Sequence, residues 1–313
     1  MLQYPIFNQL RQAIEVGYWR LEICHIQRHE ASSAAICPFP TRGRLLQSRP
    51  LADLYPRFRG EFWAMQQGAT TPTRPARDCP VHIHLLGSVD YEDCLTLQRR
   101  LAYDAATRDD GRIAILICEH RGLITIGRSG SRAHVRFSGA ELMQRHLTIR
   151  YVGRGGGAIL HAPGQLAVYP IVPLPWHGWT IGDYLRRVQA ALWQLLLEFN
   201  VRPAAVPGSF ALAGRGGILA AIGAAVRHGV TQHGAYVNVN PPMRDFGRVE
   251  TAAGQTMSSL LSQRALPTKM TKVRAALVTH LAEALELERY HLHTGHPHLA
   301  ELPAASHRRE AAA

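Results

Sequence analysis

The chain has 313 residues, of which 46% are hydrophobic and 19% charged, with a formal net charge of +12. This is the balance of a soluble globular protein, and the length allows one large domain or two small ones. No run of 18 apolar residues occurs, and the first 19 residues lack an apolar stretch followed by a cleavage site of small residues. The sequence therefore predicts neither a membrane span nor a secretory signal.

The cysteines are few and show no paired spacing of the kind that metal sites use. A disulfide framework normally needs an even number of cysteines in a small secreted protein. We therefore expect reduced thiols and a cytoplasmic location. The five cysteines are Cys24, Cys37, Cys79, Cys94 and Cys118.

The positive charge comes almost wholly from arginine, because only Lys269 and Lys272 are lysines and the other 33 of the 35 basic residues are arginines. We interpret this bias as genomic rather than functional. A basic surface nevertheless attracts acidic partners by electrostatic steering. Composition leaves two such partners open, nucleic acid and an acidic carrier protein.

Residues 1–78 show no clear pattern, and we predict that they form an extension and linker of unknown role. Prolines at four positions between 38 and 56 interrupt them, and residues 66–80 have the composition of a linker. Two interpretations remain open. Translation begins at Met65, so that the upstream part is not a folded domain, or the segment is a genuine appendage.

After residue 80 the hydrophobic pattern becomes regular, with alternating or buried apolar runs that predict strands. Asp90 is placed to cap a helix. Ser138 and Glu141 form a capping box before a short helix that reaches about His146. The predicted strands of this half are 81–86, 112–118, 123–127, 148–152 and 165–171.

The clearest helix follows Thr180, with Asp183 at N3 and one apolar face that we assign to the core. The elements predicted after it are strands 201–205, 218–227, 229–233 and 235–239, and an amphipathic helix at 269–287. Strands and helices interleave without a strict βαβ rhythm. The pattern therefore predicts an α/β (or α+β) fold with helices packed on mixed sheets.

Residues 288–313 are predicted to be a disordered polar tail. A metal site is the alternative, because the segment is rich in histidine. We favour the tail, since no carboxylate or cysteine joins the histidines at ligand spacing. The histidines are His291, His293, His296, His298 and His307.

The central motif is the segment 152–165, VGRGGGAILHAPGQ. It is neither a dinucleotide-binding nor a P-loop motif, because no helix follows it and it has no GxGxxG or GK[ST]. Arg154 followed by three glycines indicates backbone that approaches a ligand closely, although such a loop is often only a tight turn. His161 could bond a ligand carbonyl or hold the loop.

This segment resembles the signature of octanoyltransferases, the lipoate–protein ligase B family, which reads R-G-G-x-x-T-Y/F-H-G-P-G-Q. The sequence departs from it at Ile159, Leu160 and Ala162. The residues that it keeps are Arg154, Gly155, Gly156, His161, Pro163, Gly164 and Gln165.

Three further segments resemble the same family, in the right order and at about the right spacing. Residues 119–128 resemble its E-H-x-P…T-x-G-R/Q pattern, 220–231 its K-I-A-A-I-G-V-x-V-R-R-G-x-T, and 233–240 its H-G-L-A-L-N-V-N. The resemblance covers about 81–287, so we expect an octanoyltransferase-like domain over 79–287. It implies a biotin/lipoate-ligase-like fold with a larger mixed sheet, a smaller sheet and flanking helices.

The resemblance also implies a chemistry. A family member takes an octanoyl group from acyl carrier protein onto its own cysteine, and then passes it to a lysine of a lipoyl domain in 2-oxoacid dehydrogenase or glycine cleavage proteins. A neighbouring lysine lowers the pKa of the cysteine. No cofactor and no metal are implied. The implied substrate-binding residues are Arg154, Gly155, Gly156, Gly157, Ala158, Ile159, Leu160, His161, Ala221, Ile222, Gly223, Gly234, Ala235 and Tyr236.

Both catalytic residues of the family are missing. Ile218 stands where the family has its lysine, and Ala252 where it has its cysteine; a shift of one residue gives Ala253 instead. No cysteine follows Cys118, which the pattern places in a buried strand, where a core role is usual. No base is evident beside the other candidate replacements, and an arginine without a thiolate achieves little. Those candidates are Ser258, Ser259, Thr251 and Thr256, with Arg215 and Arg227 as sources of positive charge.

Three hypotheses follow. The first is an octanoyltransferase-like protein that has lost the covalent mechanism and is inactive or weakly active, and we favour it because two catalytic residues are lost together. The second is an acyltransferase that uses other residues. The third is a binding module of another class, such as a nucleic-acid-associated one, supported only by the basic charge.

Overall fold

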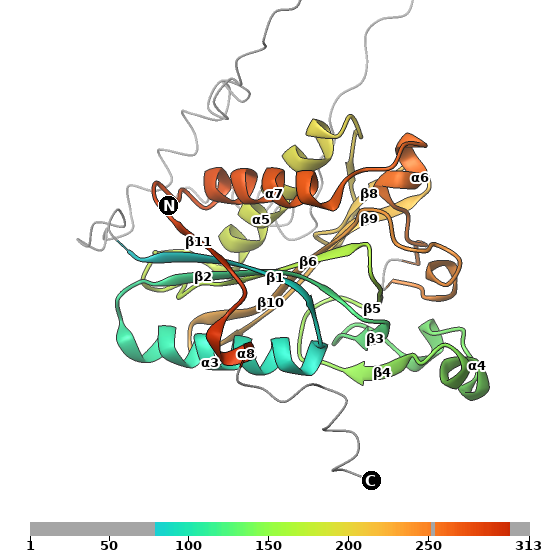
Figure 1. The fold of residues 1–313 in the computed structure, drawn as a ribbon, viewed down its shortest axis with the longest axis horizontal. Coiled ribbons are helices and arrows are strands. Elements are labelled where there is room, and N and C mark those ends of the chain that lie inside the picture. The colour runs from blue at the N-terminus through green and yellow to red at the C-terminus, as the bar shows by residue number, and fades with distance from the viewer. Residues whose placement is uncertain (1–78, 252–253, 301–313) are drawn as a thin grey trace, which may run out of the picture. The chain divides into compact units, whose positions relative to one another are not determined.

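The computed structural model describes residues 79–251 and 254–300, which belong to one compact unit (Figure 1). The predictions for 1–78, including the start at Met65, lie outside the described residues, as do Ala252, Ala253 and the end of the chain from 301. No helix in the described ranges is long and apolar enough to cross a membrane.

A mixed eight-stranded sheet is the centre of the fold. Its first three strands run parallel to one another, and each later pair is antiparallel. The order across the sheet is β11 (His291–Thr294), β1 (Val81–Val89), β2 (Ile113–His120), β6 (Gln165–Ile171), β10 (Val230–Asn238), β9 (Gly217–Arg227), β8 (Leu212–Gly214) and β7 (Ala204–Ala205).

A second sheet of three strands lies at one end of the first (Figure 1). Its central strand, β3 (Leu123–Ile126), pairs in parallel with β4 (Thr148–Tyr151) and antiparallel with β5 (Ala158–His161). The Gly-rich segment is the connection between β4 and β5. The prediction that no helix follows this loop is therefore confirmed, and the strand that follows it was not among the predicted strands.

Helices cover both faces of the large sheet (Figure 1). α5 (Ile181–Glu198) and α7 (Met270–Ala284) lie on one face, and α3 (Tyr91–Arg108) lies on the other. Alternation along β2 explains this, because Ile115 packs with α5 and α7 whereas Leu116 packs with α3. The short helices are α4 (Gly139–Gln144), α6 (Leu260–Arg264), α8 (Pro297–Ala300) and the 3₁₀ turns η4 (Arg132–His134) and η5 (Phe246–Arg248).

The predicted helix starts are confirmed by their caps. The Asp90 side chain accepts a hydrogen bond from the Glu92 amide at 2.9 Å. Ser138 and Thr180 each form the predicted capping box at the start of α4 and α5. These caps satisfy amide groups that have no partner inside the helix, which is why the signals are visible in the sequence.

Three predictions need correction. Residues 229–233 and 235–239 are one strand, β10, because Gly234 continues the antiparallel ladder opposite Gly223. The strand predicted at 201–205 is reduced to Ala204–Ala205. The tail predicted from 288 is wrong up to residue 300, because 291–294 pairs with β1 as β11 and 297–300 forms α8.

The pairing of β11 with β1 gathers histidines on one edge of the sheet. His82 and His84 lie opposite His291 and His293 in register, and the Nδ1 of His82 is 3.0 Å from the Nε2 of His293. His296 approaches His84 with 4.7 Å between ring centroids. Burial, together with the neighbouring histidines, lowers the pKa of His296 from its ordinary 6.5 to about 4, and the pKa of His82 and of His84 is lowered as well. The packing at this edge of the sheet therefore favours the neutral form of His82, His84 and His296.

We expect β11 to open from β1 in mild acid. Below pH 6.5 the unfolded segment binds more protons than the packed one, so the packing loses stability as the pH falls from about 6.5 to about 4. Hydrogen exchange of the β11 amides, corrected for intrinsic rates, measures this. Protection should fall in that window while the amides of α5 stay protected. A chain with His84→Thr and His296→Thr should lose most of the pH dependence, and equal protection of β11 across the window in the unmodified chain would refute the idea.

Candidate functional site

The Gly-rich loop is held by backbone contacts on both sides. The amides of Gly127 and Arg128 donate to the carbonyls of Gly157 and Arg154, and the Gly155 amide donates to the Ala224 carbonyl, all at 3.0–3.1 Å. A Cβ on Gly223 would stand 2.5 Å from the Gly155 oxygen. Glycine at 223 therefore permits close packing of β9 against the loop.

Arg154 at the start of this loop is fully buried, an unusual state for an arginine. Its Nη2 donates to the carbonyl and to the hydroxyl of Thr125, at 3.1 and 2.7 Å, and its Nη1 donates to the Gly155 carbonyl at 3.0 Å. Its Nε has no hydrogen-bond partner among the described residues. The cation is therefore solvated by neutral oxygens of the protein.

A chain of buried hydrogen bonds continues from Arg154. The Thr125 hydroxyl is 2.8 Å from the Nε2 of His161, and the Nδ1 of His161 is 2.8 Å from the Gln165 side-chain oxygen. The Gln165 side-chain amide donates to the Asn238 side-chain oxygen at 2.9 Å. The Asn238 side-chain amide donates to the backbone carbonyls of Ile218, at 3.3 Å, and of Ser258, at 2.9 Å.

This chain, which we call the donor chain, runs in one direction only. The Gln165 side-chain NH2 donates to the Leu160 carbonyl at 3.0 Å and to Asn238, so the Gln165 side-chain oxygen faces the Nδ1 of His161 and can only accept its hydrogen. The Nε2 of His161 therefore accepts, its Nδ1 carries the hydrogen, and the ring is neutral. Burial, with the nearby His120 and Arg154, holds the pKa of His161 well below its ordinary value, which favours the same state.

The residues expected to bind substrate come together around His161. Ala221, Ile222 and Gly223 of β9 lie opposite Tyr236, Ala235 and Gly234 of β10. The Tyr236 ring packs against His161 with centroids 4.6 Å apart, and the Arg154 guanidinium lies 5.9 Å from the same ring. The remaining members, Ala158 to Leu160, form β5 with His161, and all four are buried.

Tyr236 differs from the pattern that its segment resembles, where alanine stands at this place. The ring is 2% exposed and is among the largest fully buried side chains. The ring fills volume that a small residue would leave open, so it limits the room for an acyl chain beside His161.

Ile218, which we predicted to stand at the family's lysine position, is the second residue of β9 and is only 2% exposed, packed with Val206 and Ala211. Its amide donates to the Thr256 carbonyl at 2.9 Å, and its carbonyl accepts from the Ser258 amide at 2.8 Å. The segment that follows residue 253 thus runs along β9 beside Ile218. Met257 lies opposite Ile218 in this short parallel contact, and Ala252 lies outside the described residues.

The candidate replacements do not form a nucleophile with a base. The Ser258 hydroxyl accepts from the Gln263 amide at 3.0 Å, and the Ser259 hydroxyl caps α6. The Thr251 hydroxyl donates to the Gln255 carbonyl. Cys118 is 1% exposed, and burial raises the pKa of its thiol well above the ordinary value. An amide is no general base, and a buried neutral thiol is a weak nucleophile.

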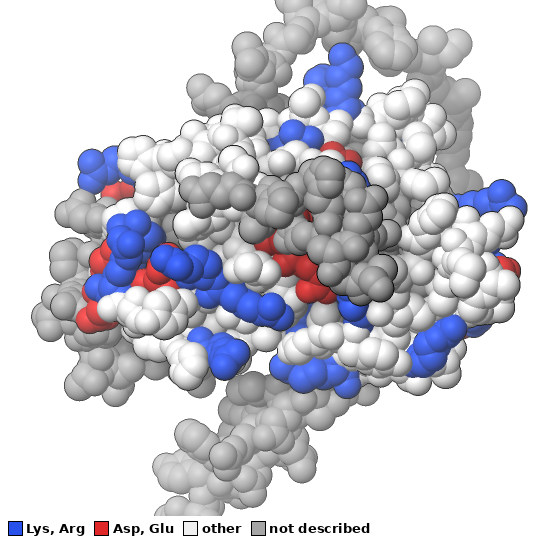
Figure 2. Space-filling view, turned by 60° about the horizontal axis from the view of Figure 1, so that its bottom comes forward, with Lys and Arg blue, Asp and Glu red and all other residues white. Residues whose placement is uncertain are grey.

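Two surface hollows rich in arginine were not predicted. One, of about 530 Å³, is lined by the start of α3 and by Arg121, Arg145 and Arg150. The other, of about 360 Å³, includes Gly153 of the loop together with Arg99, Arg128 and Arg227. Figure 2 shows the face that carries α3 and β4, with Lys and Arg side chains (blue) spread across its lower half. The arginines that line each hollow are far apart in the sequence, so no sequence pattern indicated that they would come together.

Comparison with known proteins points to the same family that the sequence motifs resemble. The lipoyl protein ligase A/B catalytic domain matches residues 90–287. An octanoyltransferase of Roseiflexus sp. (strain RS-1) is 34% identical over 230 residues, covering 71% of this chain and 95% of that protein. One of Chloroflexus aurantiacus (strain ATCC 29366 / DSM 635 / J-10-fl) is 32% identical, covering 66% of this chain and 94% of that protein.

Solved structures agree on the fold. A lipoate-protein ligase A bound with ATP has a TM-score of 0.54 at 14% identity and covers 73% of this chain and 93% of its own. A bipartite lipoate protein ligase from Thermoplasma acidophilum has a TM-score of 0.52 at 14% identity, covering 74% and 92%. The fold is therefore that of lipoate ligases. The chain belongs to the lipoyl protein ligase A/B catalytic domain family, and the resemblance to octanoyltransferases is confirmed.

We expect the donor chain to contribute measurably to stability. Thr125→Val keeps the shape of the side chain but leaves Arg154 Nη2 and His161 Nε2 without the hydroxyl, at a cost of about 1–3 kcal/mol in the free energy of unfolding. Urea unfolding of both chains measures the difference. The exposed Thr148→Val in β4 is the matched control and should change stability by less than about 0.5 kcal/mol. Equal effects of the two substitutions would contradict the role assigned to the chain.

Proposed function

We propose that this chain binds octanoyl or lipoyl groups, together with the protein domains that carry them, and has lost the covalent transfer of an octanoyltransferase. The observation that carries the proposal is the buried, apolar setting of Ile218 at the family's lysine position. Without an ammonium group there, nothing lowers the pKa of a thiol nearby, and the aligned sequence offers no thiol at Ala252.

No thiol of the described residues is placed to take over. Cys94 and Cys118 pack in the core between α3 and the sheet, whereas Ile218 packs with Val206 and Ala211. Cys79 packs against the core on the α5 and α7 side. Loss of a covalent nucleophile typically lowers the rate by several orders of magnitude, so any remaining transfer would be slow.

The two arginine-rich surface hollows support an acidic protein as the partner. Arg99, Arg128 and Arg227 line a hollow beside the Gly-rich loop, where a carrier protein would present its acyl group. Acyl carrier protein and lipoyl domains are the partners that relatives named octanoyltransferase make most plausible for this site. In this proposal residues 79–287 form the binding domain, the site includes the Gly-rich loop and the 221–223 and 234–236 strands, and the protein works in the cytoplasm without a cofactor.

The proposal is tested by restoring the lost pair. A chain with Ile218→Lys and Ala252→Cys should octanoylate a lipoyl domain from octanoyl-acyl carrier protein at least about 10³-fold faster than the unmodified chain, because a nucleophile is then present beside a cation. Intact-mass spectrometry of the acceptor measures the rate, and an octanoyl adduct on the introduced thiol should appear first.

The matched control carries Ile218→Met with Ala252→Cys, which supplies the thiol and similar side-chain volume without the charge. It should acquire the adduct more slowly than the chain with lysine. The proposal is wrong if the unmodified chain transfers octanoyl groups within about tenfold of the restored one. It is also wrong if the folded, unmodified chain binds neither octanoyl-acyl carrier protein nor a lipoylated domain.

A further inference from the structure

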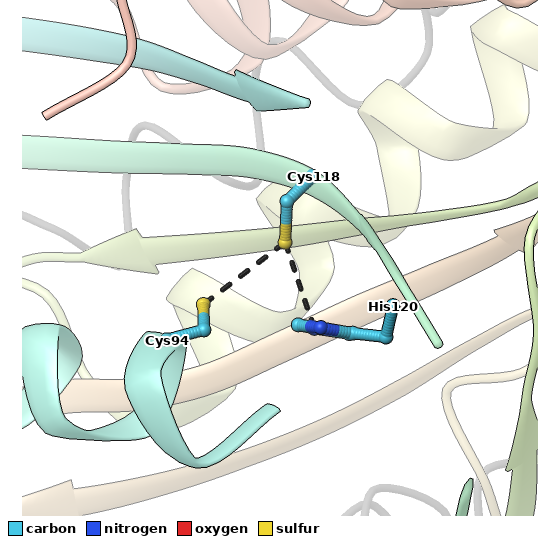
Figure 3. A group of neighbouring side chains, drawn as sticks. All are labelled: Cys94, Cys118 and His120. Carbon is cyan, nitrogen blue, oxygen red and sulfur yellow. Dashed lines mark hydrogen bonds between the residues drawn. The ribbon is translucent and has the colours of Figure 1, made fainter. Parts of the chain in front are cut away.

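A second cluster of chemically active side chains lies outside the site described above. Cys94 comes from the first turns of α3, and Cys118 and His120 come from one face of β2 (Figure 3). All three are at most 2% exposed. Figure 3 shows both sulfur atoms and the imidazole turned toward one space between the helix and the sheet.

The distances within this cluster fit one small ion. The sulfur atoms of Cys94 and Cys118 are 4.0 Å apart, the Cys118 sulfur is 3.5 Å from the Nε2 of His120, and all three atoms lie within 4.8 Å of one another. Zinc bonds of about 2.3 Å to sulfur and about 2.0–2.1 Å to nitrogen separate tetrahedral ligands by about 3.5–3.8 Å. Shifts of a few tenths of an ångström would therefore bring two of the three distances, Cys94 to Cys118 and Cys118 to His120, to those of a tetrahedral zinc site.

The imidazole is already oriented as a ligand. The Nδ1 of His120 is 2.9 Å from the Val89 carbonyl, which can only accept, so Nδ1 carries the hydrogen. Its Nε2 therefore presents a lone pair toward Cys118 and toward the Tyr169 hydroxyl, 2.6 Å away. A carbonyl that fixes the outer nitrogen of a ligating histidine is a common support in metal sites.

Charge decides which ion fits. We propose that Cys94, Cys118 and His120 bind one thiophilic divalent cation, zinc, in a buried structural site, with the Tyr169 hydroxyl or a water completing the set. Two thiolates and a neutral imidazole balance a 2+ ion, so the buried site has no net charge, whereas a monovalent ion would leave one. Binding converts two thiols to thiolates and releases two protons.

The position of Cys94 supports the same assignment. Its backbone amide donates to the Asp90 carbonyl at 3.0 Å in the first turn of α3, and its side chain lies on the face of the helix that packs against Leu116 and Cys118 of β2. The ion would join α3 to β2, two elements that otherwise meet through apolar packing. The cysteines show no metal-site spacing in the sequence, because Cys94 and Cys118 lie on a helix and a strand, 24 residues apart.

Zinc content of the untagged full chain, produced with zinc and dialysed against a weak chelator, is the first measurement. We expect about one zinc ion per chain, and cobalt substituted for zinc should give the sulfur-to-cobalt charge-transfer absorption of thiolate ligands. Cys118→Ala should abolish both signals. The cobalt spectrum of the unmodified chain does not depend on how well any variant folds.

Two controls separate this site from other ligands of the chain. His82→Asn with His293→Asn removes part of the surface histidine edge, and Cys24→Ala with Cys37→Ala removes the thiols of the 1–78 segment; both variants should keep the ion. Three results would overturn the proposal: no zinc and no thiolate band in the reduced chain, a Cys94–Cys118 disulfide in the native protein by peptide mass mapping, or an ion retained by Cys118→Ala.

Discussion

The buried hydrogen-bond chain that starts at Arg154 has a single direction, which is fixed at both of its ends. Arg154 can only donate, so the Thr125 hydroxyl accepts from it. The Leu160 carbonyl can only accept, so the Gln165 side-chain NH2 faces it, the Gln165 oxygen accepts from the Nδ1 of His161, and the Nε2 of His161 is left to accept from Thr125. The links come from β3 and β5 of the small sheet and from β6 and β10 of the large one. One polar chain therefore joins the two sheets, and breaking any link leaves a buried polar atom without a partner.

The end of this chain fixes the backbone around Ile218. Asn238 holds the carbonyls of Ile218 and Ser258, which are backbone atoms. The backbone of the site is thus fixed whatever side chain stands at 218. An apolar isoleucine then stabilises the position by packing with Val206 and Ala211, where a lysine without a thiolate would carry an uncompensated buried charge.

Much of the fold could be predicted from the sequence because its signals are local. The caps at Asp90, Ser138 and Thr180 and the period-two pattern of β2 depend on residues within one turn or one strand. The donor chain was only partly visible, since nothing near Thr125 or Asn238 in the sequence marks a partner that lies 36 or 73 residues away. The strand β11 was missed for the same reason, because its pairing with β1 spans the whole domain and its histidines resemble a polar tail.

The thiol cluster and the site around His161 are neighbours through aromatic rings. Tyr169 bonds His120 at 2.6 Å, and its ring meets that of Tyr236 at 6.0 Å between centroids. The rings of His120 and His161 are 5.9 Å apart. A cation bound at the Nε2 of His120 would take the lone pair that Tyr169 now contacts, so the phenol would either become the fourth ligand or, where a water is the fourth ligand, need another partner in a closely packed interior. The thiol cluster and the site around His161 therefore share one packed set of aromatic rings, even though no residue belongs to both.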